Sequence, residues 1–162
     1  MVVCDATAIP LRGDVAYLAV VLDVYSRKIV GWALDRIQSV QLMVDALRQV
    51  IARGPCEAMI CHSDQGSQYT SKAFRLVCEA NHIRQSVGSV GDCYDNAMAE
   101  SFFATLKSEC TSNRPFETLA VAEREIGLYI NEYYNNERLH SSIGYRTPND
   151  VEQSFKSEEA NL

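Results

Sequence analysis

The sequence lacks any long apolar run. Its longest, residues 16–24, is interrupted by Asp23 and falls well short of the roughly 20 residues that cross a bilayer. Its first residues hold no basic segment followed by an apolar stretch, so we expect no secretory signal. These absences argue against membrane-embedded and secreted proteins and favour a cytoplasmic one.

The sequence also lacks paired cysteines. Its six cysteines are spread singly over 162 residues, without the density of a disulfide scaffold, so a reduced interior fits best. No C-x₂-C pair occurs, and Cys56, Cys61 and His62 alone make a poor tetrahedral set, which disfavours structural zinc.

A basic excess is absent as well. The 15 Lys and Arg against 21 Asp and Glu give a net charge of −6, which argues against a generic nucleic-acid coat protein. The imbalance is uneven, because residues 111–162 hold 9 acidic and 5 basic side chains whereas residues 1–64 hold 7 and 6. The charge therefore predicts weak, salt-sensitive DNA binding without excluding a polyanionic partner.

The pattern of apolar residues and turn residues predicts a single mixed α/β domain over residues 1–155, followed by a polar tail over 156–162 that we expect to be disordered. The first three strands form an antiparallel meander, and two more strands alternate with helices. The strands are expected at residues 2–9, 15–24, 28–34, 58–61 and 83–87. The helices are expected at residues 42–51, 71–80, 96–109 and 119–134, with a short last one from 148.

Three carboxylates have unusual settings. Asp5 lies within an apolar strand, where burying a charge is costly unless it is paired or binds a metal. Asp64 follows the fourth strand, at the kind of edge where ligands bind in open α/β sheets. Glu100 lies near the start of a helix. Together they would form an oxygen-only site suited to Mg²⁺ or Mn²⁺, although each alone is also compatible with an ordinary turn or helix-end role.

The helix that carries Glu100 has a polar stripe. At 100° per residue, Asn96, Glu100, Ala104 and Lys107 share one face, while Met98, Phe102 and Leu106 face the opposite way and can seal against the sheet. Such a stripe can meet both a metal and a phosphate. An ordinary amphipathic surface helix explains the periodicity equally well.

Several longer motifs occur in order. They are DAT at residues 5–7, HSDQGSQYTS at 62–71, CYDNAMAESFF at 93–103 and YNNERLHSSIGYRTP at 134–148. With these motifs the chain closely resembles the integrase catalytic core of the DDE transposase and retroviral integrase superfamily. Within it, the chain is most similar to the second-frame transposases of copy-out, paste-in bacterial insertion sequences.

The resemblance implies a ribonuclease H-like fold, with a five-stranded mixed sheet of three antiparallel and then two parallel strands. It implies that Asp5, Asp64 and Glu100 are both the catalytic triad and the ligands of two Mg²⁺ or Mn²⁺ ions. It also implies that Lys107 contacts the DNA end and that Asn96 lines the site. The implied partners are the element's DNA ends, target DNA and further copies of this chain, with the protein on the nucleoid when it binds DNA.

The implied function is metal-dependent DNA strand cleavage and strand transfer. Two alternatives remain open: a ribonuclease H-like nuclease that uses only water, and an inactive core that pairs with a full-length transposase and inhibits it. The second alternative stems from the N-terminal helix-turn-helix region of such transposases, which we expect this chain to lack. Relatives also commonly carry an aromatic residue at the position of Ala8 and His at that of Cys61.

Other side chains keep two interpretations each. His62 can tune the site beside Asp64 or serve a structural hydrogen bond. His140, near Arg138, can reach a DNA phosphate or pack locally. The tyrosines at 129, 133 and 134 fit a core or a subunit interface better than a base-stacking platform.

Overall fold

The computed structural model of the protein describes residues 1–88, 97–112 and 114–159. In this part of the chain five strands form one sheet in the order β3-β2-β1-β4-β5. The strands are β1 (Val2–Leu11), β2 (Asp14–Asp23), β3 (Ile29–Asp35), β4 (Ile60–Ser63) and β5 (Arg84–Val87). The first three pair in antiparallel fashion, β4 joins β1 in parallel and β5 joins β4 in parallel, which confirms the predicted mixed sheet.

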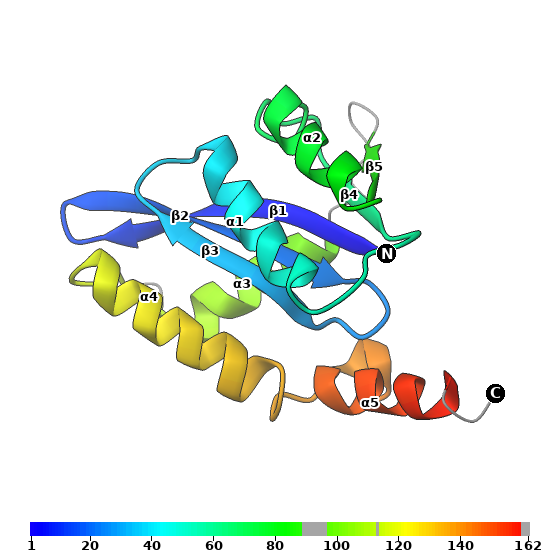
Figure 1. Ribbon diagram of the computed structural model, residues 1–162. Helices are drawn as coiled ribbons and strands as arrows, with labels where there is room; N and C mark the ends of the chain where they lie inside the picture. Colours follow the sequence, from blue (N-terminus) through cyan, green and yellow to red (C-terminus); the bar gives the residue numbers. More distant parts are fainter. Residues whose placement is uncertain (89–96, 113, 160–162) are drawn as a thin grey trace.

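Helices cover both faces of this sheet (Figure 1). They are α1 (Val40–Ile51), α2 (Lys72–Ala80), α3 (Ala97–Glu109), α4 (Leu119–Leu128), the π-helix η1 (Tyr129–Tyr134), the 3₁₀ helix η2 (Ser141–Ile143) and α5 (Pro148–Glu159). One core lies between the sheet and α1 with α2, and a second lies between the sheet and α3 with α4. Helix α5 packs near the turn between β2 and β3, where Lys28 forms a 2.6 Å ion pair with Glu152.

The sequence of strand β2 reflects the burial of both faces of the sheet. Leu18, Val20 and Leu22 point into the α3–α4 core, while Ala19 and Val21 point into the α1–α2 core. A strand buried on both faces reads as a continuous apolar run instead of an alternating one. The longest apolar run of the sequence is therefore an internal strand.

Gly31 in β3 allows the closest approach between the sheet and α1. A Cβ at this position would lie 2.2 Å from the carbonyl oxygen of Ala46, which no side chain can tolerate. The absence of a side chain here lets α1 pack directly on β3.

Two strands differ from their predicted ranges. Strand β1 continues through Pro10 to Leu11, because Pro10 pairs with Val15 of β2 but lies beyond the short pairing with β4. A proline that lacks an N–H is tolerated on such an open edge. Strand β4 begins at Ile60, later than the predicted start at 58, because Ala58 adopts a left-handed φ of 62° and the chain is still turning there.

The C-terminal helices are longer than expected in one place and irregular in another. The single helix predicted over 119–134 is α4 followed by the π-helix η1, in which the N–H of Asn135 bonds to the carbonyl of Ile130, five residues earlier. Helix α5 runs to Glu159, four residues into the segment expected to be a disordered tail; residues 160–162 lie outside the described part.

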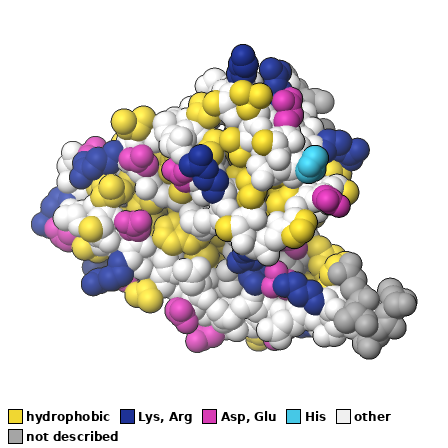
Figure 2. All heavy atoms as spheres, viewed as in Figure 1, with side chains coloured by type: hydrophobic (Ala, Val, Ile, Leu, Met, Phe, Trp, Pro, Cys, Tyr) yellow, Lys and Arg dark blue, Asp and Glu magenta, His cyan; other side chains and the backbone are white. Residues whose placement is uncertain are grey.

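The surface carries mixed charge. Figure 2 shows basic and acidic side chains interspersed over the viewed face, with no large field of one sign, in keeping with the modest net charge. Within the described ranges, no helix combines the length and apolarity that crossing a membrane requires.

Candidate active site

Asp5 and Asp64 lie at the same level on neighbouring strands. The parallel pairing of β1 with β4 ends at Cys4 opposite Ser63, so the two aspartates are the next residue on each strand. This is also the point at which the strand order reverses, since the chain goes from β1 to β2 on one side and returns with β4 on the other. Ligand sites of open α/β sheets lie at such a switch point, by the carboxyl ends of strands.

Each aspartate is oriented by its own loop or strand. The Ala6 N–H donates to Oδ1 of Asp5 at 2.7 Å, and the Gly66 N–H donates to Oδ1 of Asp64 at 2.9 Å. A Cβ on Gly66 would lie 2.8 Å from that same Asp64 oxygen, so a glycine lets the loop fold closely around the carboxylate. Asp5 is half-buried and Asp64 is exposed.

A buried phenol lies near both carboxylates. Tyr69, between β4 and α2, packs edge-on against Phe74 with ring centroids 5.3 Å apart. Burial raises the pKa of the Tyr69 hydroxyl well above its usual value, and the negative charges of Asp5 and Asp64 raise it further. Both carboxylates are therefore close enough to act on one hydroxyl, which agrees with their shared register.

Helix α3 crosses the face of β1 that carries Asp5. Thr7 shares this face because side chains alternate along a strand, and Nζ of Lys107 donates to Oγ1 of Thr7 at 2.8 Å. Beyond the helix, Phe116 forms a bridge with Leu11, so the chain advances along β1 as it leaves α3. The N-terminal end of α3 accordingly lies on the Asp5 side of Lys107.

Glu100 occupies that N-terminal end. It is exposed, and it lies on nearly the same side of α3 as Lys107, two turns earlier. From Lys107 back to Glu100 the helix rises about 10.5 Å, and from Thr7 back to Asp5 the strand extends roughly 6.6 Å. Because Lys107 contacts Thr7, Glu100 lies in the neighbourhood of Asp5. The buried face is Ala99, Phe102, Phe103 and Leu106. Met98, predicted on that face, is only partly buried.

The side chains of Asp5, Asp64 and Glu100 are of a type that binds hard cations, but they do not form a closed ligand set. The three predicted ligands are carboxylates, whose oxygens Mg²⁺ and Mn²⁺ prefer. Over residues 1–88, 97–112 and 114–159, no three His, Cys, Asp or Glu side chains gather closely enough to hold an ion. The assignment of Asp5, Asp64 and Glu100 as metal ligands therefore stays a prediction.

The family now follows from comparison with known proteins. The family model described as "Integrase core domain" matches residues 1–93, and a second model of the same description matches residues 81–148. This chain belongs to the integrase core domain family.

Relatives of this integrase core are transposases. The chain is 43% identical over 150 residues to the transposase for insertion sequence element IS904 of Lactococcus lactis subsp. lactis strain IL1403; the match covers 92% of this chain and 59% of that protein. It is 36% identical over 137 residues to transposase InsF for insertion sequence IS3A of Escherichia coli K12, over 84% of this chain and 48% of that protein. The chain thus spans about half the length of the curated relatives it matches.

Solved structures confirm the ribonuclease H-like fold of the core. The catalytic core domain of HTLV-2 integrase, solved in a trimeric form in complex with magnesium, superposes with a TM-score of 0.71 over 93% of both chains at 16% identity. A chain of the simian T-cell lymphotropic virus intasome superposes with a TM-score of 0.75 over 93% of this chain and 52% of that one, at 18% identity.

Other predicted residues have varied outcomes. Nδ1 of His62 lies 3.0 Å from Oγ of Ser86 on β5, a contact that fits the structural interpretation of this histidine. Asn96 lies outside the described residues. Ala8 is exposed, whereas Cys61, where relatives commonly have His, is buried with its Sγ 2.8 Å from that of Cys4. The two cysteines are 57 residues apart, so no local sequence pattern predicts the contact between their thiols.

A second cluster of polar and charged side chains lies at the C-terminal end of α3. Arg138 binds Glu109 with both Nε and a terminal nitrogen, at 2.9–3.0 Å, and the Tyr129 hydroxyl donates to the same carboxylate at 2.7 Å. NH1 of Arg138 lies 3.3 Å from Nδ1 of His140. Sequence analysis singled out Arg138 and His140 but could not find Glu109, whose role depends on a contact 29 residues along the chain.

Proposed function

We propose that this chain is the catalytic core of an insertion-sequence transposase, which carries out metal-dependent DNA strand cleavage and strand transfer. The observation that carries the proposal is the shared register of Asp5 and Asp64 beneath the helix that bears Glu100 and Lys107. The relatives, which are named as transposases, support it.

Asp5, Asp64 and Glu100 would together hold the two divalent cations. The chemistry supplied by bound cations would be activation of the attacking oxygen and neutralisation of the charge on the leaving 3′-oxygen. The backbone donors of Ala6 and Gly66 fix one oxygen of each aspartate and so limit the directions in which the carboxylates bind. Catalysis then consists of positioning and charge neutralisation, without a covalent enzyme intermediate.

Lys107 would bind the DNA end. Its ammonium is held by Thr7 beside the carboxylates and can move to a phosphate oxygen of the substrate. The proposed partners are therefore the ends of the element and target DNA, with at least a second copy of this chain to hold two ends together. The proposed location is the bacterial cytoplasm, on the nucleoid.

The test is strand cleavage and joining on a branched DNA that mimics the joined product, a substrate that asks little of end recognition. The wild-type chain is expected to give product only with Mn²⁺ or Mg²⁺. Glu100→Gln is expected to reduce the rate by at least about 100-fold, because it removes a charged ligand at a site of developing charge. Glu123→Gln, the same change at an exposed position of α4, is the matched control and should keep full activity.

Three results would contradict the proposal. Product that forms equally in EDTA would exclude the metal mechanism. Cleavage without any joining would favour the nuclease alternative. A folded wild-type chain that gives no product on this substrate would favour an inactive, inhibitory core.

A further inference from the structure

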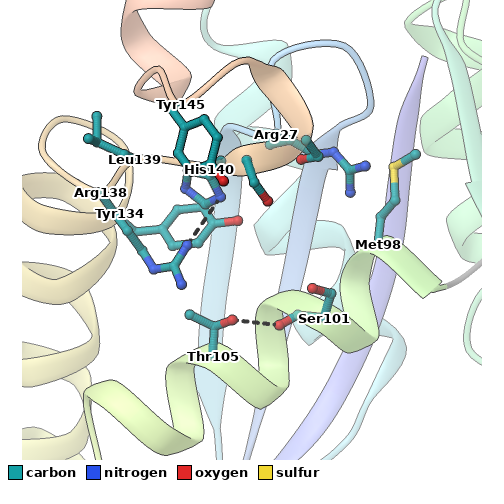
Figure 3. A pocket seen from close by; sticks show the side chains of 11 residues that line it. Arg27, Met98, Ser101, Thr105, Tyr134, Arg138, Leu139, His140 and Tyr145 are labelled. Atoms are coloured by element: carbon teal, nitrogen blue, oxygen red, sulfur yellow. Dashed lines mark hydrogen bonds between the residues drawn. The ribbon is translucent and has the colours of Figure 1, made fainter.

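A polar cavity lies on the side of α3 next to the one that bears Glu100. Its volume is about 500 Å³, and its walls come from α3, the turn between β2 and β3, and the segment from Tyr134 to Tyr145 (Figure 3). In Figure 3, Arg27, Ser101 and Arg138 approach it from these three parts of the chain. None of the described residues that line it is Asp or Glu, whereas two are arginines.

Arg27 is the first of these arginines, and it lacks an acidic partner. It is half-buried, and within the described ranges its guanidinium makes no ion pair or hydrogen bond. Burial raises the pKa of Tyr134 and lowers that of His140; the positive charge of Arg27 opposes the rise at Tyr134 and adds to the fall at His140, so the guanidinium lies near both rings. A partly desolvated cation without a counter-charge favours an anionic ligand.

The backbone at Arg27 strengthens this argument. Its φ is +65°, in the left-handed region that glycine or asparagine adopts with less strain. Backbone strain of this kind is concentrated at binding and catalytic sites. An arginine at this turn thus places a long cationic side chain where a smaller residue would fit the turn better.

The second arginine is fixed in place by its neighbours. Glu109 holds the Arg138 guanidinium, and the Tyr129 hydroxyl donates to the same Glu109 carboxylate; NH1 of Arg138 is directed to His140. Burial and the charge of Arg138 lower the pKa of His140, which is therefore neutral near pH 7. Its Nε2 is buried and has no hydrogen-bond partner among the described residues, a polar atom that a bound group or water can satisfy.

Hydroxyl groups complete the lining. Ser101, Thr105, Ser141, Ser142 and Tyr145 line the cavity, and the Thr105 hydroxyl donates to the Ser101 carbonyl one turn earlier on α3 at 2.9 Å (Figure 3). Guanidinium and hydroxyl donors without a carboxylate suit an anion with several acceptor oxygens, and a phosphate group has this character.

We propose that this cavity binds a phosphodiester group of the DNA backbone, held by Arg27, Arg138 and the Ser101 hydroxyl of α3. The inference rests on the proposed function, because Ser101 directly follows Glu100 and a strand bound at the carboxylates would continue past the adjacent side of the helix. The cavity would thereby position DNA and contribute no reacting group.

The experiment measures the affinity of the full chain for a short fluorescein-labelled DNA duplex in EDTA, between about 50 and 200 mM salt. Arg27→Gln is expected to weaken binding about five-fold and to make the plot of log K against log salt shallower by about 0.7–0.9, the value for one lost phosphate contact. The matched control is Arg124→Gln, which removes the same charge from an exposed ion pair on α4 and should leave the slope nearly unchanged.

A second pair of variants avoids the strained turn. Thr105→Glu adds a negative charge inside the cavity and should weaken DNA binding by about ten-fold, by analogy with the cost of placing like charges together. Gln153→Glu adds the same charge on an exposed face of α5, outside the cavity, and should change binding little. Melting temperatures of all variants establish that they fold.

Two outcomes would overturn the inference. Equal slopes for Arg27→Gln and Arg124→Gln would show that only net charge matters. Stabilisation of the wild type, but not of Arg27→Gln, by inorganic phosphate, with an unchanged DNA slope, would show a site for a free anion. DNA binding is measured without metal, so it tests the phosphate site independently of catalysis. A shallower salt dependence in Arg27→Gln supports the phosphate site even if the wild type transfers no strand. Active strand transfer with an unchanged salt dependence refutes the phosphate site and leaves the proposed function standing.

Discussion

The two sides of α3 organise charge in opposite ways. On one side, Asp5 and Asp64 each accept a hydrogen bond from a backbone N–H within two residues of themselves. On the other, Arg138 is held by Glu109, 29 residues away, and lies against His140. The acidic residues are thus oriented locally, whereas the basic cavity is built by contacts across the fold.

This difference follows from the charge of the side chains that surround each group. Like charges cannot stabilise one another, so a carboxylate site can be only partly assembled until a cation enters it. An arginine with an acidic partner can be fixed beforehand, because the pair neutralises itself while leaving other donors of the guanidinium exposed to the cavity. We therefore expect metal to change the acidic side strongly and the basic side little.

The largest effect is expected from Asp64→Asn. The asparagine can still accept the Gly66 N–H, so the loop should keep its shape while the ligand charge is lost. Strand transfer should fall by at least about 100-fold. Mn²⁺ at about ten times its dissociation constant should stabilise the wild type by about 1.4 kcal/mol, or about 3–6 °C in melting temperature, and should not stabilise the variant.

Thermal melting with and without Mn²⁺ checks this prediction, with Asp45→Asn on α1 as the matched control. An Asp64→Asn chain that retains the full metal shift would refute the role of Asp64 as a ligand.

Asn135→Ala should affect the basic side and leave the metal response intact. The buried Asn135 amide bonds to both the N–H and the carbonyl of Ile29, each at 3.0 Å, and so ties the C-terminal segment to the strand that follows Arg27. Losing both bonds leaves two buried backbone groups unpaired, at a cost of roughly 3 kcal/mol. Urea unfolding measures this, with the exposed Asn131→Ala as a control expected to change stability by less than about 0.5 kcal/mol.

The smallest effect is a difference in acid stability. Burial alone would raise the pKa of Glu109, but hydrogen bonds from Arg138 and Tyr129 outweigh it and lower the pKa below the ordinary 4.5. The folded state thus favours the carboxylate, and its stabilisation, complete above about pH 4.5, is lost as the pH falls through the lower folded value.

The free energy of unfolding should accordingly fall less steeply between about pH 5 and pH 3 in Glu109→Gln than in the wild type. Chemical denaturation at a series of pH values measures both slopes. Identical slopes, with Glu123→Gln as the reference, would mean that Glu109 is not held as an ion in the folded chain.

Much of the fold could be predicted from the sequence, because its signals are local. The meander, the apolar spacing of α1 and the periodicity of α3 all depend on neighbouring residues. The start of β4 was misplaced because the left-handed turn at Ala58 carries no glycine to mark it. The π-helix was missed because its residues read as ordinary helix formers.

The site was predictable only through long motifs. Asp5 and Asp64 stand out by their setting and by resemblance, but their shared level depends on the pairing of strands 59 residues apart, which no local pattern encodes. Arg27 was missed entirely, because an arginine in a short turn is unremarkable until the cavity around it is known. The shared level of the two aspartates and the cavity around Arg27 both depend on contacts between distant segments, and the sequence did not predict those contacts.

The π-helix η1 also constrains how this chain can vary. A wide turn accommodates one residue more than an α-helical turn of the same length. Deleting one residue from 129–134 would therefore let this turn become α-helical while the segment after it keeps its orientation, so that Asn135 can stay at Ile29 and Arg138 at Glu109. A second deletion has no wide turn to absorb it and would rotate everything after it by about 100°. This segment should thus tolerate the loss of one residue but not of two.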